Sequence, residues 1–180
     1  MDNQYLGLDL SLTGSGIVWL RDNEVLYRTT LTPPKNTRGY DRLIYIRKNV
    51  IMAAVRARSH GQRRQLVGVV EGYAYGAMNK AHDIGELGGV VRTALHEDGY
   101  MMLIVPPTTL KKFVTGAGNA KKESMLMHTL NRWGVMFSDN NQCDAYGLAR
   151  FGEAYFDDAE WELTEFQRKV IADFKANHGQ

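Results

Sequence analysis

Cysteine is almost absent from this sequence of 180 residues, and long apolar runs are missing altogether. The single Cys143 excludes an internal disulfide framework, and no run of about 18 apolar residues is available to span a bilayer. The N-terminus also lacks the basic region, apolar stretch and cleavage pattern of a secretory signal. We therefore expect a protein of the reducing cytoplasm that has no contact with a membrane.

A strong charge of one sign is missing as well. The 22 basic and 20 acidic side chains leave a net charge of +2, so total charge does not identify a nucleic-acid binder. Their distribution is uneven, because basic residues gather at 38–64 and 111–122 whereas six acids lie between Glu153 and Glu165. This asymmetry favours a groove for a polyanion with an acidic rear. For the first basic cluster, a solvated helix face is an equally good interpretation.

The pattern of apolar residues predicts one domain of strands and helices. Alternation and turn residues indicate an antiparallel meander of three strands, at 5–10, 17–20 and 25–31. Continuous apolar runs indicate two strands buried on both faces, at 66–70 and 101–105. Helical spacing indicates helices at 38–58, 79–97, 120–133 and 144–156, and a capping box at 164–167 precedes a last, short helix. This order predicts an α/β fold with a mixed five-stranded sheet flanked by helices.

Three acidic residues stand in otherwise apolar elements. Asp9 lies between Leu8 and Leu10, Glu71 follows an apolar strand, and Asp144 begins an apolar helix. An unpaired buried charge costs several kcal/mol, so a cation must compensate these carboxylates. If the first and fourth strands are neighbours, Asp9 and Glu71 converge at one edge of the sheet, and a helix crossing that edge adds Asp144.

Clustered carboxylates indicate a site for a hard cation. Mg²⁺ takes oxygen ligands and keeps several waters that a phosphate can replace, which points to phosphoryl transfer. For any single acid a salt bridge or a helix N-cap is an alternative, and for Asp144 the N-cap is the main one.

Four ordered motifs carry a resemblance to a known family. They are the segments 7–16 around Asp9, 69–71 ending in Glu71, 111–122 with its lysines and glycines, and 144–149 beginning with Asp144. Together they resemble the RuvC-type Holliday junction resolvases of the RNase H-like superfamily, over residues 5 to about 154. The resemblance implies an RNase H-like fold, with a nuclease domain at 1–158. The stretch beyond about residue 156 lies outside the resemblance, and we expect 159–180 to be a C-terminal helical extension of the same domain.

The resemblance also implies roles for the residues at the predicted site. Asp9, Glu71 and Asp144 correspond to the metal-binding carboxylates of the family. Lys111 and Lys122 fall on its two functional lysines, which approach the DNA phosphate near the active site.

One position departs from the family pattern. Three residues before Asp144 the family has a second acid or a histidine, whereas this sequence has Asn141. An amide oxygen can coordinate a metal but brings no charge. Either Asn141 or the nearby Asp139 is therefore expected to complete the metal site.

The implied activity is the resolution of Holliday junctions and other branched DNA by paired nicks. Two Mg²⁺ ions about 3.5 to 4 Å apart, with Mn²⁺ as a substitute, would support in-line hydrolysis of the phosphodiester. Since a junction is nearly two-fold symmetric, we expect a homodimer. The helix at 79–97 resembles the family's dimerisation helix, and its small residues Gly85, Gly88 and Gly89 would form the interface. Packing of these glycines against the chain's own sheet is the alternative.

Further DNA contacts are expected around the carboxylates. Tyr73 and Tyr75 stand just beyond the glutamate strand, where an aromatic ring could stack on an unpaired base, although ordinary loop packing is as good an explanation. Thr13 and Ser15 of the first turn, and Lys112 and Lys121 of the lysine segment, are expected to contact the DNA backbone.

Three other functions compete with this hypothesis. An RNase H or flap nuclease would share the carboxylates without needing a dimer. An actin-like or sugar-kinase-like nucleotide binder could use Asp9 and the glycines that follow as a phosphate loop, but the chain is short for the two domains of that fold. The neutral Asn141 also makes a catalytically weak DNA-junction binder conceivable.

Overall fold

The computed structural model describes residues 3–60, 64–72, 81–157 and 163–178, apart from the side chains of 81–83. Its strands are β1 (Asn3–Asp9), β2 (Ser15–Arg21), β3 (Glu24–Leu31), β4 (Gln65–Glu71) and β5 (Met101–Val105). Its helices are α1 (Gly39–His60), α2 (Ala81–Glu97), α3 (Pro107–Thr115), α4 (Lys122–Trp133), α5 (Asn140–Phe156) and α6 (Glu165–His178).

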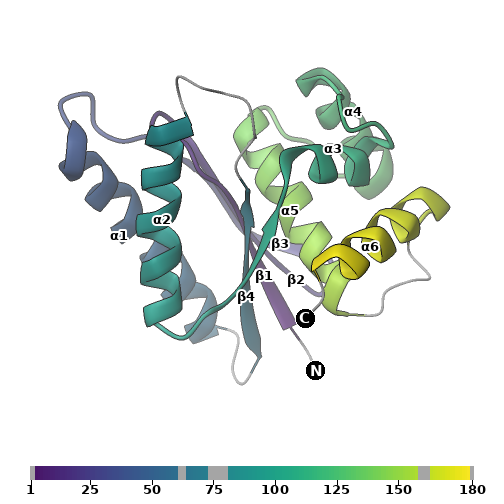
Figure 1. Cartoon of the computed structure of the whole chain (residues 1–180), viewed down its shortest axis with the longest axis horizontal. Coiled ribbons are helices and arrows are strands. Elements are labelled where there is room, and N and C mark those ends of the chain that lie inside the picture. Colours follow the sequence, from purple (N-terminus) through teal and green to yellow (C-terminus); the bar gives the residue numbers. More distant parts are fainter. Residues whose placement is uncertain (1–2, 61–63, 73–80, 158–162, 179–180) are drawn as a thin grey trace.

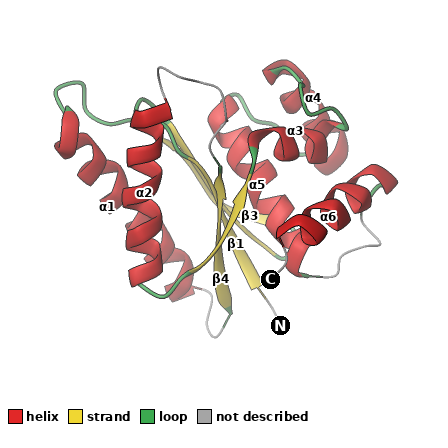
Figure 2. Ribbon diagram, viewed as in Figure 1, coloured by secondary structure: helices red, strands yellow, loops and turns green. Residues whose placement is uncertain are grey.

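The strands form one sheet in the order β3-β2-β1-β4-β5. The first three strands pair antiparallel, whereas β4 runs parallel to β1 and β5 runs parallel to β4. Helices α1 and α2 cover one face, and α5 crosses the other with α3, α4 and α6 around it (Figure 1). Figure 2 shows the sheet between these two layers of helices. The predicted mixed five-stranded sheet is confirmed.

Burial within the sheet falls from the centre to the edges. In β4 the residues from Leu66 to Val70 are buried, as the continuous apolar run predicted. The same prediction is wrong for β5, in which Met101 and Ile104 are 41% and 42% exposed. The reason is the strand order, because β5 is an edge strand with a neighbour on one side alone. An apolar run predicts a strand but does not say where in the sheet it lies.

Helix α5 lies directly on the sheet because two strand residues have no side chain. A Cβ added at Gly7 of β1 would stand 1.8 Å from the carbonyl oxygen of Ala145, and one at Gly16 of β2 would stand 1.9 Å from that of Asn141. Both distances are shorter than any real contact of a Cβ atom. These two glycines therefore determine how closely the first half of α5 approaches β1 and β2.

Helix α3 is missing from the sequence prediction. Pro107 stands in its first turn, and Gly116 ends it in the left-handed conformation with φ 85°, where its N–H donates to the carbonyl oxygen of Lys112 at 2.8 Å. A proline at the start and a glycine after the end are typical of a helix. This pattern could have revealed α3, but the pair Pro106-Pro107 was interpreted only as the end of a strand.

The start of α5 also differs from the prediction. The segment 138–142 was expected to be a polar loop before a helix at 144, whereas α5 begins at Asn140. Asp139 is its N-cap, and its carboxylate accepts the N–H of Asn141 at 2.7 Å. Asp144 thus lies in the second turn of the helix, so its interpretation as an N-cap is wrong.

The C-terminal helix α6 packs on α3 and α5. In the expected capping box, the Gln167 side chain accepts the backbone N–H of Thr164 at 3.2 Å. Gln167 is itself buried and donates to the carbonyl oxygen of Phe113 in α3 at 3.1 Å. Val170 and Phe174 are buried as the predicted apolar stripe requires.

Among the described helices, none has the combination of length and apolar character needed to cross a bilayer.

Candidate functional site

Three carboxylates come together where β1 and β4 end. Asp9 is the last residue of β1 and Glu71 the last of β4. The two strands are adjacent and parallel, with Leu8 beside Val70, so both acids follow at the same edge of the sheet. Asp144 reaches this edge from α5, because the helix backbone rests on Gly7 and Gly16. The predicted convergence of the three acids is present in the fold.

The carboxylates act on one another electrostatically. Burial raises the pKa of Asp9 well above its ordinary range, and the charges of Glu71 and Asp144 raise it further. Burial and the Asp144 charge raise the pKa of Glu71 to about 7. For Asp144, burial raises the pKa to about 6 even though two lysines oppose the shift. Such mutual repulsion is what a bound cation relieves.

The two lysines that face the carboxylates are Lys111 of α3 and Lys122 of α4. Their positive charges lower the pKa of both Glu71 and Asp144 against the effect of burial. These are the two lysines that the family resemblance singled out. Lys111 lies in the helix before the glycine-containing loop at 116–119, and Lys122 lies in the helix after it. The loop therefore brings both lysines to the same site.

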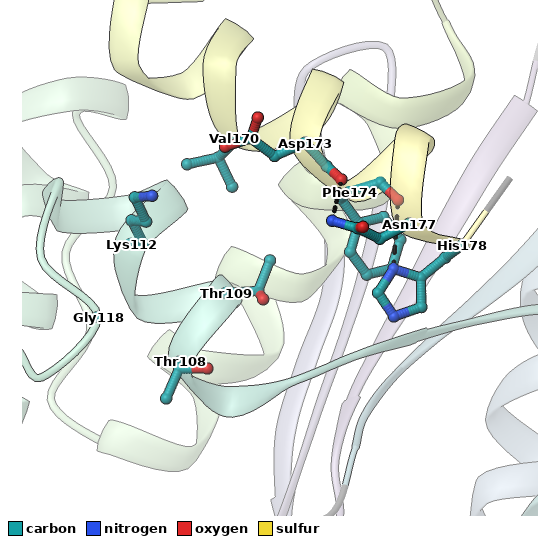
Figure 3. Close-up of a pocket in the computed structure, with 9 residues that line it drawn as sticks. All are labelled: Thr108, Thr109, Lys112, Gly118, Val170, Asp173, Phe174, Asn177 and His178. Atoms are coloured by element: carbon teal, nitrogen blue, oxygen red, sulfur yellow. Dashed lines mark hydrogen bonds between the residues drawn. The ribbon is translucent and has the colours of Figure 1, made fainter.

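The neighbouring Lys112 points elsewhere. It lines an open pocket of about 220 Å³ between α3 and α6, together with Thr108, Asp173 and Asn177 among others (Figure 3). Neither Lys112 nor Lys121 is among the charges that shift the pKa of Glu71 or Asp144. For Lys112, its place in the pocket between α3 and α6 agrees with the predicted difference, while the role of each lysine stays a prediction.

The donor set suits a hard cation, although it is not preassembled. Within the described residues, no three His, Cys, Asp or Glu side chains stand close enough together to form a ready metal centre. Rotation of these side chains would bring their oxygens close enough to share one ion. Three carboxylates and neutral amide oxygens are the ligand types that Mg²⁺ prefers.

Asn140 adds a further oxygen that the sequence analysis missed. Its Oδ1 atom is buried and has no hydrogen-bond partner within the described residues. It precedes Asp144 by four residues on α5, so the two side chains share one face of the helix. The spacing of four residues was visible in the sequence, but it became meaningful only when α5 proved to begin at Asn140.

Asp139 and Asn141 occupy different surroundings. The Asp139 carboxylate accepts the N–H of Asn141 at 2.7 Å and the Thr30 hydroxyl at 2.6 Å. The Asn141 side chain lies beside the turn between β1 and β2, where its Nδ2 atom would be 3.2 Å from a Cβ added at Gly14. Both residues are near the carboxylates, but only Asp139 is engaged by strand β3.

The turn after Asp9 corrects one predicted DNA contact. Ser15 is fully buried, and its hydroxyl donates to the Ser11 carbonyl oxygen at 2.8 Å and accepts the Ser11 N–H at 3.0 Å. It closes the turn and offers no surface to DNA, so its assignment as a DNA-binding residue is wrong in this fold. Thr13, at the tip of the turn, is exposed and is compatible with the prediction.

The remaining predicted site residues are the two tyrosines after β4 and the glycines of α2. Tyr73 and Tyr75 lie outside the described residues. On α2, a Cβ added at Gly85 or Gly89 would meet no atom of the described residues within 4 Å, which gives no support to packing of these two against the chain's own sheet. Gly88 is buried within the chain, which contradicts its predicted place at a dimer interface.

Part of the first basic cluster is engaged within the chain. The Arg56 guanidinium lies 5.6 Å from the ring centre of Tyr27, and that of Arg58 lies 5.5 Å from the ring centre of Tyr100. Arg64 forms an ion pair with Asp22 at 2.6 Å. These contacts favour the interpretation of this cluster as a helix face rather than as a polyanion groove.

Comparisons with known proteins identify the fold. A Thermus thermophilus RuvC structure in complex with a Holliday junction substrate aligns with a TM-score of 0.66 and 20% identity, over 82% of this chain and 90% of that one. A second Thermus thermophilus RuvC structure aligns with a TM-score of 0.64 and 19% identity, over 98% of this chain and 96% of that one. No protein-family model and no curated protein matches the sequence. The chain therefore has the fold of these RuvC structures, as the motifs predicted.

Proposed function

We propose that this protein is an endodeoxyribonuclease that cuts branched DNA, with four-way junctions as its principal substrate. One observation carries the proposal: Asp9, Glu71 and Asp144 share one edge of the sheet, and Lys111 and Lys122 face them from two helices. The likeness to a RuvC structure that holds a Holliday junction substrate supports the choice of substrate.

The carboxylates would hold Mg²⁺, with Mn²⁺ as a substitute, and the amide oxygens of Asn140 or Asn141 would complete the site. When bound, two such ions supply an activated water and stabilise the charge that develops in phosphodiester hydrolysis. Lys111 and Lys122 would attract the phosphate into the site and offset negative charge there. Burial of Asp9 and Glu71 keeps bulk water from screening these charges.

A homodimer is part of the proposal, because paired nicks on opposite strands need two active sites related by two-fold symmetry. Helix α2 supports it at Gly89, where an added Cβ would meet no atom of the described residues within 4 Å. Sedimentation analysis of the wild type and of Gly89→Trp tests this part. A wild-type dimer that the substitution dissociates is expected, and a monomeric wild type would remove the dimer from the proposal.

Cleavage assays with labelled substrates test the proposed activity. Four-way junction, Y-form, flap, duplex and RNA–DNA hybrid substrates are incubated with wild type and Asp9→Asn, with and without Mg²⁺. Mg²⁺-dependent cleavage of the junction by wild type alone is expected. Preferred cleavage of the hybrid or of the flap would favour the two other nucleases, and junction binding without any cleavage would favour a DNA-structure binder.

A further inference from the structure

One row of residues crosses the sheet beneath the start of α5. In the register of the antiparallel strands, Asp9 of β1 pairs with Gly16 of β2, and Gly16 pairs with Thr30 of β3. The first turn of α5 lies above this row, since the Asn141 carbonyl oxygen approaches Gly16. Asp9 and Thr30 are thus the two ends of a line across three strands, and α5 passes over its middle.

Thr30 holds the first turn of α5 through a single hydroxyl. The hydroxyl donates to Oδ2 of Asp139 at 2.6 Å and accepts from Nε2 of Gln142 at 3.1 Å. The other oxygen of Asp139, Oδ1, accepts the N–H of Asn141 at 2.7 Å. Both carboxylate oxygens of Asp139 are therefore engaged, one by the helix backbone and one by the edge strand.

Distance separates Asp139 from the carboxylates at the other end of the row. Neighbouring strands are about 4.8 Å apart, so the backbones of Thr30 and Asp9 are about 10 Å apart. A Mg²⁺ ion binds its oxygens at about 2.1 Å. Asp139 is thus held at the β3 end of the row, with both of its carboxylate oxygens already engaged by Thr30 and by the Asn141 N–H.

We propose that Asp139 is a positioning residue and not a metal ligand: with Thr30 it anchors the first turn of α5 to β3, and this anchor holds Asp144 above Asp9. The place three residues before Asp144 then belongs to Asn141, whose side-chain amide makes no hydrogen bond within the described part of the chain. This inference rests on the proposed nuclease function. It identifies Asp139 as the residue that keeps Asp144 aligned with Asp9.

The anchor matters because catalysis tolerates little displacement. A shift of about 1 Å in a reacting group costs about a hundredfold in rate. Asp144 follows Asp139 by five residues, little more than one turn of α5, so any movement at the cap reaches the carboxylate directly.

The test compares substitutions at the anchor with one matched control. Thr30→Val and Asp139→Ala remove the contact. Asp139→Asn restores the contact in part, because the Oδ1 oxygen of asparagine can still cap the Asn141 N–H and its Nδ2 group can donate to the Thr30 hydroxyl. Thr29→Val is the control, since Thr29 is the neighbouring residue of β3 and points to the opposite side of the strand.

Three measurements are made on each variant: hydrogen exchange at the Asn141 amide, Mn²⁺ affinity without DNA, and the single-turnover cleavage rate. Thr30→Val and Asp139→Ala should each speed exchange about tenfold, the effect of losing one hydrogen bond, and should lower the cleavage rate about as much. Their double variant should be no worse than either single one. Asp139→Asn should recover part of what Asp139→Ala loses in exchange and in cleavage rate while keeping the wild-type Mn²⁺ affinity, and Thr29→Val should match wild type in all three measurements.

A ligand role for Asp139 gives the opposite pattern. Mn²⁺ affinity would then fall in Asp139→Asn as much as in Asp139→Ala, while Thr30→Val would bind Mn²⁺ and exchange like wild type, and that result overturns the anchor. If wild type cleaves no branched DNA, the nuclease proposal fails, but hydrogen exchange still decides the anchor. Unchanged exchange at Asn141 in Thr30→Val refutes it whatever the activity.

Discussion

The two faces of the sheet are packed in different ways. On the α5 face, helix backbone touches strand backbone at Gly7 and Gly16, and aromatic rings such as Phe113 and Phe151, 5.1 Å apart, fill the space around the contact. On the other face, α1 and α2 stand off the sheet on mainly aliphatic side chains. The outer surface of these two helices exposes several large apolar residues: Ile44, Met52, Val55 and Ile84.

This difference in packing gives the two faces of the sheet different roles. A backbone contact leaves no room for adjustment, so the α5 face can hold Asp144 at a constant height above Asp9. Aliphatic side chains repack more readily than a backbone contact does, so the α1 and α2 face tolerates substitution. We infer that the α5 face carries the chemistry and that the opposite layer of helices is available for a partner.

Removing the carboxylate charges should have the largest effect and should localise activity to the α5 side. Asp9→Asn, Glu71→Gln and Asp144→Asn are each expected to lower Mg²⁺-dependent cleavage by at least about a thousandfold. Junction binding should persist, because it draws on phosphate contacts. Glu97→Gln, at the end of α2, is the control and should cleave normally. Any of the three variants that cleaves at the wild-type rate does not belong to the site.

Adding one methyl group should separate the two faces most directly. Gly7→Ala and Gly16→Ala place a Cβ less than 2 Å from helix carbonyl oxygens, so we expect a loss of about 3 kcal/mol or more in the free energy of unfolding. In the unassociated chain, Gly89→Ala meets no atom of the described residues within 4 Å and should stabilise α2 by about 1 kcal/mol. Urea denaturation measures all three. Equal effects would mean that α5 does not depend on a backbone contact.

The lysines should divide into two kinds. Lys111→Ala and Lys122→Ala are expected to lower the single-turnover rate at saturating protein by about a hundredfold, because these charges face the carboxylates. Lys112→Ala and Lys121→Ala should weaken binding and reduce the salt dependence of the affinity by about one unit of slope, with the rate unchanged. If all four only weaken binding, the segment is a general basic patch.

The pH dependence of stability should show the smallest effect. Folding raises the pKa of Glu71 from 4.5 to about 7 and that of Asp144 from 3.8 to about 6. The folded state therefore holds these protons more tightly, and the resulting stability is present below pH 4 and is lost as pH rises through about 6 to 7. For each kcal/mol of unfolding free energy lost across this range, the Tm of the metal-free protein should fall by about 2 to 4 °C.

Calorimetry with and without Mg²⁺ checks this dependence. Above pH 7 the ion should restore the lost stability, because it binds the deprotonated carboxylates. Glu71→Gln should flatten the fall in Tm with pH. A Tm that instead rises between pH 5 and 7 in the metal-free protein would contradict the raised pKa values.

The sequence by itself determined the elements that depend on local periodicity and the residues that match ordered motifs. The meander, the strand before Glu71 and the spacing of Asp9, Glu71 and Asp144 all follow from the pattern of apolar and acidic residues along the chain. Physical reasoning predicted the meeting of the three acids, because parallel neighbouring strands end at the same edge.

Only the tertiary structure decided which side chain meets which neighbour. β5 became an edge strand, Ser15 turned inward, Gly88 was buried, and Asp139 was drawn to Thr30, which lies 109 residues away along the chain. Local patterns specify the face on which a residue lies but not the register between distant segments. That register depends on how closely two backbones approach, and here Gly7 and Gly16 set the approach for α5.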